Sequence, residues 1–153
     1  MSALLVTDTT ALISLDNIGR LDILPELYAP VLAPPAVVRE FGRALPPWVR
    51  ERAPDDEAGV AALRLRLDAG EAEAIVLARR LPGALLLIDE ARGRRVAVDL
   101  GLRIIGTAGV LLGAKRAGLV PHVKPLLDEL RERHAFRLST PLYDWIVREA
   151  GEG

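Results

Sequence analysis

The chain has 153 residues, half of them hydrophobic, a formal net charge of -1 and no cysteine. These values predict one globular domain over residues 1–153, and the lack of cysteine excludes thiolate metal sites and cysteine nucleophiles. No apolar stretch approaches the roughly 20 residues of a membrane span, and the first residues do not resemble a signal peptide, so we expect a cytoplasmic protein with no membrane partner.

Short apolar runs alternate with amphipathic segments along the chain, which is the pattern of an α/β protein with a parallel sheet. Strands are expected at residues 4–6, 31–32, 84–88, 103–105 and 136–138. Helices are expected at residues 9–18, 34–41, 60–67, 71–81, 91–100, 107–115, 126–133 and 141–150. The segment 42–59 is rich in proline and charge, so we expect an exposed loop there.

Two aspartates, Asp8 and Asp89, each come at the end of an expected strand. In open parallel α/β sheets the carboxyl ends of the strands form the edge where ligands bind. One such aspartate is explained equally well as a turn or helix cap, but two in the same position favour a shared site. Because a buried carboxylate needs a partner, a proton or a metal, the sequence predicts a metal site of oxygen ligands, which suits Mg²⁺ or Mn²⁺.

Two glutamates of one expected helix, Glu71 and Glu73, compete for a place in this site. Glu71 lies on the apolar side, because Ala74 and Ile75 follow it at spacings of three and four residues. Glu73 lies at the polar border, where a solvated or ion-paired role is expected. An interaction with the helix N-terminus, typically ~0.3–1 kcal/mol, explains an acid in the first turn but not one on the apolar side. Helical phase therefore favours Glu71, with Glu73 as the alternative.

Arginine supplies nearly all of the positive charge, and three arginines follow closely after the second aspartate: Arg92, Arg94 and Arg95. Guanidinium groups suit phosphates, so these three are candidate substrate contacts. A solvated helical surface explains any one of them equally well. The stretch 106–109, Gly-Thr-Ala-Gly, lacks the Gly-Lys-Ser/Thr ending of a phosphate loop and is better explained as a tight strand-to-helix turn. Thr107 is expected to offer its hydroxyl at the rim of the site.

Five segments, taken in order, resemble the PIN-domain nucleases, in particular VapC-type toxins with Gly-Glu and Gly-Thr-x-Gly-Val-Leu elements. The segments are 6–13, 37–40, 70–78, 87–90 and 106–112. The resemblance covers nearly the whole chain and implies a three-layer α/β/α fold with a central, mostly parallel sheet of about five strands. It also implies an acidic pocket that binds Mg²⁺ or Mn²⁺ and hydrolyses RNA, and a cognate antitoxin as a protein partner.

The acids of the family correspond to positions of this chain. The first aspartate of the family corresponds to Asp8, and the glutamate that the family carries on a helix corresponds to Glu40. The last acid of the family, at the end of a strand, corresponds to Asp89, and the hydroxyl that orients the site corresponds to Thr10. Taken alone, Glu40 would more often be an ordinary boundary glutamate. The third acid of the family is commonly an aspartate that opens a helix. This chain has Glu71 in the better register, which lengthens the ligand by one methylene.

The resulting hypothesis is a site with one or two metal ions, which would activate water and neutralise the leaving oxygen of a phosphodiester. The expected ligands are Asp8, Glu40, Glu71 and Asp89, and a supporting role with water or with these ligands is expected for Glu73 or Glu90.

Two other functions are compatible with the sequence. One is a non-catalytic PIN-like module that binds RNA or protein. The other is a phosphatase resembling the haloacid dehalogenases, but their motif has a second aspartate where this chain has Thr10. On the last expected helix, Leu142 and Trp145 would serve a homodimer interface or the core equally well.

Overall fold

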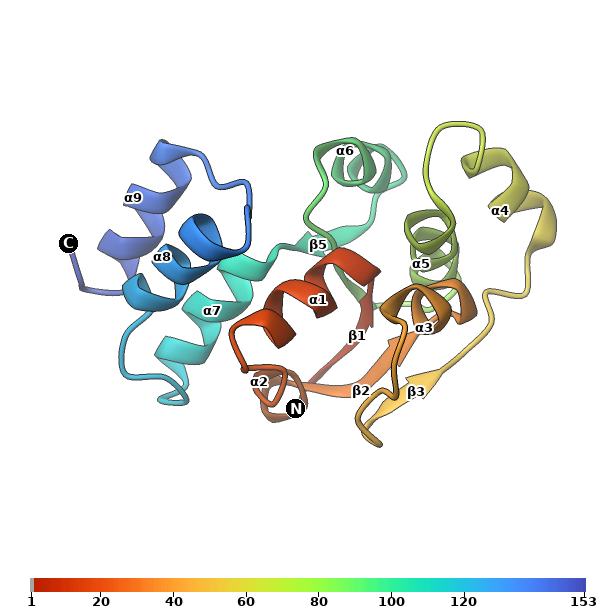
Figure 1. Ribbon diagram of the computed structural model, residues 1–153. Coiled ribbons are helices and arrows are strands. Elements are labelled where there is room, and N and C mark those ends of the chain that lie inside the picture. The colour runs from red at the N-terminus through yellow and green to blue at the C-terminus, as the bar shows by residue number, and fades with distance from the viewer. Residues whose placement is uncertain (1) are drawn as a thin grey trace.

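The computed structural model describes residues 2–153, which form a wholly parallel five-stranded sheet covered by helices (Figure 1). In pairing order the strands are β3 (Val49–Glu51), β2 (Tyr28–Ala33), β1 (Ala3–Thr7), β4 (Leu85–Leu87) and β5 (Arg103–Ile105). The helices are α1 (Thr9–Asn17), α2 (Ile23–Leu27), α3 (Pro35–Phe41), α4 (Glu57–Leu63), α5 (Ala69–Arg79), α6 (Ala91–Asp99), α7 (Thr107–Arg116), α8 (Lys124–Arg133) and α9 (Thr140–Glu149). Within the described chain, every helix is too short or too polar to cross a bilayer.

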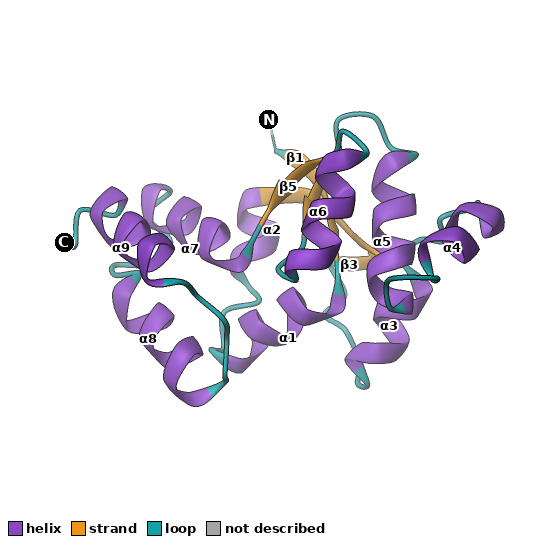
Figure 2. Ribbon diagram, turned by 90° about the horizontal axis from the view of Figure 1, so that it is seen from above, coloured by secondary structure: helices purple, strands orange, loops and turns teal. Residues whose placement is uncertain are grey.

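The inner strands send alternate side chains to opposite faces of the sheet, as the two-residue period of a strand requires. On one face, Leu5 and Leu87 belong to a buried cluster with α1, α2, α3, α7, α8 and α9. On the other face, Val6 and Leu86 belong to a cluster with α5 and α6, against which α4 packs. The predicted three-layer α/β/α fold is therefore confirmed. Figure 2 shows α7, α8 and α9 gathered at one end of the molecule, away from α4 and α5.

Two strand predictions were wrong. Residues 136–138 form no strand, because the amide of Phe136 donates to the carbonyl of Leu130 (3.1 Å) and so completes the end of α8 instead of pairing with the sheet. Conversely, β3 lies inside the segment 42–59 that was expected to be a loop. This strand pairs with β2 only, at the edge of the sheet, and two of its three residues are exposed polar ones. A hydrophobic pattern does not reveal such a strand.

The end of the chain is held by Glu152, which follows α9. Its carboxylate accepts hydrogen bonds from Nζ of Lys115 (3.0 Å) and from the amides of Val123 (2.7 Å) and Lys124 (3.0 Å). Burial raises the pKa of Glu152, but the two amides and the ammonium together outweigh burial and lower the pKa below its ordinary value. Glu152 thus joins the C-terminal residues to α7 and to the beginning of α8.

We predict that Glu152→Gln lowers the free energy of unfolding at neutral pH by about 1–3 kcal/mol, because three hydrogen bonds lose their charged acceptor. Folding lowers the pKa of Glu152, so this stabilisation is present above the ordinary value of 4.5 and disappears as the pH falls through the folded-state pKa. Urea unfolding at several pH values measures both effects. The control is Glu149→Gln, which breaks an exposed ion pair with Arg116 and should cost less than about 1 kcal/mol. Equal losses in both variants would contradict this role of Glu152.

Candidate active site

The carboxyl ends of β1, β4 and β5 meet at one edge of the sheet, where the residues that follow the strands are linked by backbone hydrogen bonds. The amide of Asp8 donates to the carbonyl of Leu87 (3.0 Å), and the amide of Ile88 donates to the carbonyl of Ile105 (2.9 Å). Asp8 and Asp89 therefore leave neighbouring strands at the same edge, which is the edge where open α/β sheets bind ligands.

The side chain of Asp8 is fully buried, and one of its carboxylate oxygens lacks a partner. Oδ1 accepts a hydrogen bond from the amide of Ala11 (2.9 Å) and so caps the beginning of α1. Oδ2 has no hydrogen-bond partner within residues 2–153. Burial raises the pKa of Asp8 well above its usual value, and nearby negative charges, including those of Asp89 and Glu71, raise it further. Capping alone does not explain a buried oxygen without a partner.

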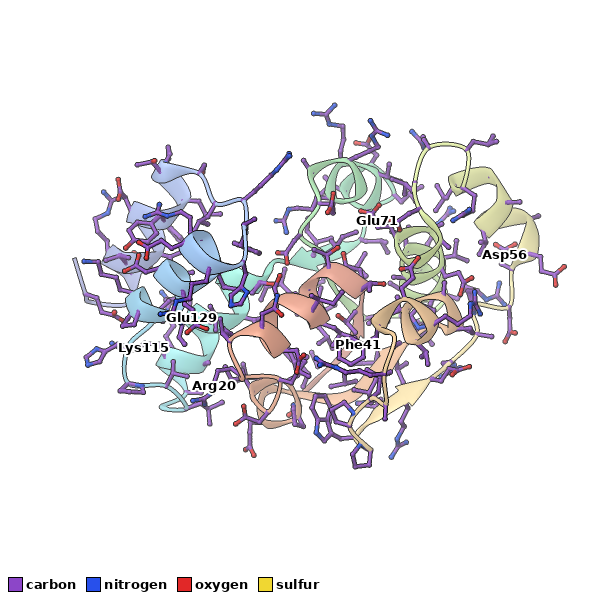
Figure 3. The ribbon with its side chains drawn as sticks, viewed as in Figure 1. Arg20, Phe41, Asp56, Glu71, Lys115 and Glu129 are labelled. Carbon is purple, nitrogen blue, oxygen red and sulfur yellow. The ribbon has the colours of Figure 1, made fainter. Side chains whose placement is uncertain are left out.

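Glu71 lies in the first turn of α5, and Figure 3 shows it between α5 and α6. The helix is capped by Asp68, whose Oδ1 accepts from the amide of Glu71 (2.9 Å). The glutamate is 8% exposed, and its Oε2 is a second buried oxygen without a partner in the described part of the chain. Burial, together with the charges of Asp68 and Glu90, raises the pKa of Glu71 from 4.5 to about 7. Glu71 therefore resembles Asp8 in needing a proton or a cation.

Asp89 is fixed by the beginning of α7. Thr107 donates its amide to Oδ1 (2.7 Å) and its hydroxyl to Oδ2 (2.5 Å). Burial raises the pKa of Asp89, while the bonds from Thr107 and the charge of Arg94 act in the opposite direction. The strand-to-helix turn that the sequence indicated is tight, because Gly106 alone separates β5 from α7 and residues 107–109 already belong to the first turn of the helix. The expectation that Thr107 reaches the rim was wrong, because this residue is fully buried and positions Asp89 instead.

Two other glutamates from the sequence prediction have different surroundings. Glu40 is exposed on α3, and its Oε1 accepts a hydrogen bond from the hydroxyl of Thr9 (2.5 Å). Glu73 points to the beginning of α3, where its Oε1 accepts from the amide of Ala36 (2.9 Å) and its Oε2 lies 4.0 Å from the guanidinium of Arg39. These contacts give Glu73 a structural role at α3, as its position at the polar border of the helix suggested, and they do not support the metal-ligand alternative.

The predicted substrate contacts also differ in accessibility. Thr10 lines a cavity that Asp89 shares. Arg92 and Arg95 are exposed on α6, and the guanidinium of Arg92 donates weakly to the carbonyl of Arg66 (3.4 Å). Arg94 instead turns inward and donates to the carbonyl of Ile88 (2.7 Å). Arg94 is thus tied to the end of β4, whereas Arg92 and Arg95 remain exposed on α6.

Three contributors to the site were missed in the sequence: Asp68, Gly70 and Gly93. Both glycines lie within helices, where glycine costs about 1 kcal/mol relative to alanine and therefore requires a reason. A Cβ on Gly93 would lie 2.6 Å from Oε2 of Glu71, and a Cβ on Gly70 would overlap the carboxylate of Glu40. For Gly93, a glycine inside the predicted helix 91–100 and close after Asp89 was the signal that could have identified the position, whereas Gly70 lay just before the predicted helix 71–81. Asp68 was recognisable as an N-cap residue, but not as a charge near Asp8.

The donor chemistry of this edge fits a hard divalent cation. Within residues 2–153, no group of three or more acidic or histidine side chains is arranged around one metal position. Asp89 is hydrogen-bonded to Thr107, and Glu40 to Thr9. Two buried carboxylate oxygens nevertheless remain without partners, on Asp8 and Glu71. A Mg²⁺ or Mn²⁺ ion binds such oxygens and would replace the protons that burial otherwise favours.

A family model described as DUF3368, a PIN domain, matches residues 4–152. The chain belongs to the PIN-domain family. PIN domains are generally nucleases that bind nucleic acid and use divalent metal ions. Comparisons with curated proteins and with solved structures give no significant match. The family match covers the acidic edge of this PIN domain and all five strands except the first residue of β1.

The raised pKa of Glu71 predicts a specific pH dependence of the metal-free protein. The folded state holds a proton on Glu71 up to about pH 7, whereas the unfolded state releases it near 4.5. Stability is therefore lost as the pH rises from 4.5 through 7, by up to about 3 kcal/mol. Glu71→Gln should remove this part of the pH dependence in chelator-treated protein, as measured by urea unfolding. The exposed control Glu132→Gln should retain it, and an unchanged profile in Glu71→Gln would contradict the assignment.

Gly93→Ala tests the close approach of α6 to Glu71. Alanine favours the helix, but its Cβ would displace Oε2 of Glu71 and also lie 2.7 Å from Cδ1 of Ile88. We expect Mn²⁺ to raise the melting temperature less in this variant than in the wild type. The control Gly113→Ala lies in α7, where a Cβ would meet only Cδ1 of Leu27 at 3.8 Å. That variant should gain up to about 1 kcal/mol of stability and keep the full Mn²⁺ response. The same Mn²⁺ response in both variants would contradict the proposed contact.

Proposed function

We propose that this PIN domain is a Mg²⁺- or Mn²⁺-dependent ribonuclease that hydrolyses RNA phosphodiester bonds. The proposal is carried by the two buried carboxylate oxygens of Asp8 and Glu71 that have no partner. Both lie near the carboxyl edge of a parallel sheet, and both carboxylates have raised pKa values. A cation would satisfy both oxygens, and the family supports nuclease chemistry at such a site.

In this proposal the cation is held by the two buried acids, Asp8 and Glu71, together with the half-buried Asp89 and the exposed Glu40. When bound, a divalent cation makes a nucleophile from water and neutralises charge on the leaving oxygen. The remaining residues prepare the acids for this role. Thr107 fixes both oxygens of Asp89, and Asp68 caps α5 so that Glu71 begins its first turn in a defined position.

In this proposal the RNA substrate approaches the acids from the exposed side of α6. Arg92 and Arg95 supply guanidinium groups for phosphates, and Thr10 supplies a hydroxyl in the cavity beside Asp89. Glu90 is exposed directly after Asp89, where it orients water or a ligand. Arg94 stays at the end of β4 and stabilises the charge of Asp89.

We further propose that the protein is the toxin of a toxin–antitoxin pair and acts on RNA in the cytoplasm. The support is the ordered resemblance of its motifs to VapC-type toxins. In addition, Leu142 and Trp145 on α9 are 44% and 46% exposed, whereas Ile146 and Val147 of the same helix are buried. An apolar surface of this kind suits an antitoxin or a second copy of the chain.

A non-catalytic PIN-like module that binds RNA or protein is the second candidate. One observation favours it, namely that no three acids of the described chain surround a common metal position. In that case the protons on Asp8 and Glu71 would satisfy the buried oxygens permanently. Cleavage and metal binding then separate the two candidates.

Asp8→Asn should reduce metal-dependent RNA cleavage about 100-fold or more, because it removes the charge of a metal ligand. Mutating only the residues that support a metal ligand typically lowers metal affinity or activity 10–100-fold. The measurement is cleavage of labelled RNA by the purified protein with Mg²⁺ or Mn²⁺, and a chelator should abolish activity in the wild type. Asp99→Asn, which changes an exposed aspartate at the other end of α6, is the matched control and should keep full activity.

Melting curves complete this test. Mn²⁺ should raise the melting temperature of the wild type, since it binds the folded state, and it should act more weakly on Asp8→Asn. Mn²⁺ binding without any RNA cleavage would support the non-catalytic module. Full cleavage by Asp8→Asn, or no effect of Mn²⁺ on the wild type, would contradict the metal-dependent ribonuclease.

A further inference from the structure

A cavity of about 540 Å³ extends away from the acidic edge along α1. Asp89 and Glu90 lie at one side of this cavity, and α1 contributes Thr10, Ser14 and Asn17. Because Asp89 belongs to the candidate active site, a substrate bound there has direct access to the cavity. Its volume falls within the range of about 300–1,000 Å³ that is typical of ligand pockets.

Another wall of the cavity is formed by residues 134–137, which belong to the connection between α8 and α9. This connection was expected to contain a strand, so its role was not apparent from the sequence. The turn is held by two hydrogen bonds to one acceptor, since the amides of His134 (3.2 Å) and Phe136 (3.1 Å) both donate to the carbonyl of Leu130. Ala135 has a φ of 53°, a region that favours glycine and costs other residues about 1–2 kcal/mol. The chain therefore keeps an unfavourable but defined conformation in this wall.

Two side chains of this wall have the chemistry to bind a nucleic acid strand. Arg137 is exposed and forms no ion pair or hydrogen bond with residues 2–153, so its guanidinium is available for a phosphate. Phe136 is half-buried, with part of its ring packed against the core and the remainder lining the cavity. An aromatic face next to a free cation is the combination that stacks an unpaired base and neutralises its phosphate. His134 lies 3.6 Å from Glu129, so it already has a partner.

We infer that this cavity binds the single-stranded segment of RNA next to the cleaved bond, with Arg137 on a phosphate and Phe136 against a base. The inference rests on the proposed ribonuclease function, because it places the reacting phosphodiester at Asp89. The distribution of charged side chains in the cavity lining supports this placement of the RNA. Asp89 and Glu90 line the cavity beside the proposed metal ion, and Arg137, on a different segment of the lining, is free to neutralise a phosphate. Bases of a duplex are already stacked, so Phe136 selects unpaired RNA.

The test is RNA binding by Arg137→Gln and Phe136→Leu, each combined with Asp8→Asn so that the bound RNA is not cleaved during the measurement. The probe is a labelled single-stranded RNA of mixed sequence, with the corresponding duplex as a comparison. Arg137→Gln should weaken binding about tenfold and reduce the slope of log affinity against log salt by about 0.7, the value for one phosphate contact on a single strand. Phe136→Leu keeps an apolar side chain against the core and should weaken single-strand binding about fivefold or more.

The matched control is Arg103→Gln, which removes an exposed arginine at the first residue of β5 and so at the opposite edge of the sheet. It should leave the affinity and the salt slope unchanged. Equal weakening by Arg103→Gln and Arg137→Gln, unchanged binding in both cavity variants, or equal binding of duplex and single strand would each overturn the cavity assignment. RNA cleavage by otherwise wild-type protein is measured separately. Cleavage with unchanged binding in the cavity variants rejects the cavity alone, whereas absence of cleavage rejects the ribonuclease.

Discussion

Two buried carboxylate oxygens without partners, on Asp8 and Glu71, are the constraint on which the rest of this site depends. Leaving an ionised carboxylate buried and unpaired costs several kcal/mol, so each must hold a proton or bind a cation. Their raised pKa values express this cost in the metal-free state. A fold that keeps both acids in place sacrifices stability at neutral pH, which is the arrangement expected where strain serves a function.

The neighbouring elements are arranged around these two acids. Asp8 directly follows β1 and caps α1, so the sheet and a helix fix its backbone together. Gly93 lets α6 approach Glu71, and Thr107 uses two donors to hold Asp89 at the beginning of α7. Each contact connects a carboxylate to a regular element, which gives the acids more defined positions than a flexible loop would provide.

Much of this arrangement was predictable from local patterns. Strand ends followed by aspartate located Asp8 and Asp89, and the 3.6-residue period distinguished the buried Glu71 from Glu73 at the helix border. Contacts between distant segments were not predictable. The pairing of β3 depends on backbone bonds that polar residues do not reveal, and the role of Thr107 depends on the pairing of β5 with β4, which brings Thr107 to Asp89. The cavity wall at 134–137 was missed because its backbone closes α8 instead of joining the sheet.

The most direct test of the account is the number of protons released when Mn²⁺ binds the metal-free protein, measured by calorimetry in buffers of different ionisation enthalpy. At a pH slightly below the pKa of about 7 of Glu71, we predict that Asp8 and Glu71 release protons as the cation replaces them. Glu71→Gln should bind Mn²⁺ more weakly and release fewer protons. Tight binding with no proton release, or identical release by the wild type and Glu71→Gln, would contradict the claim that these buried acids form the metal site.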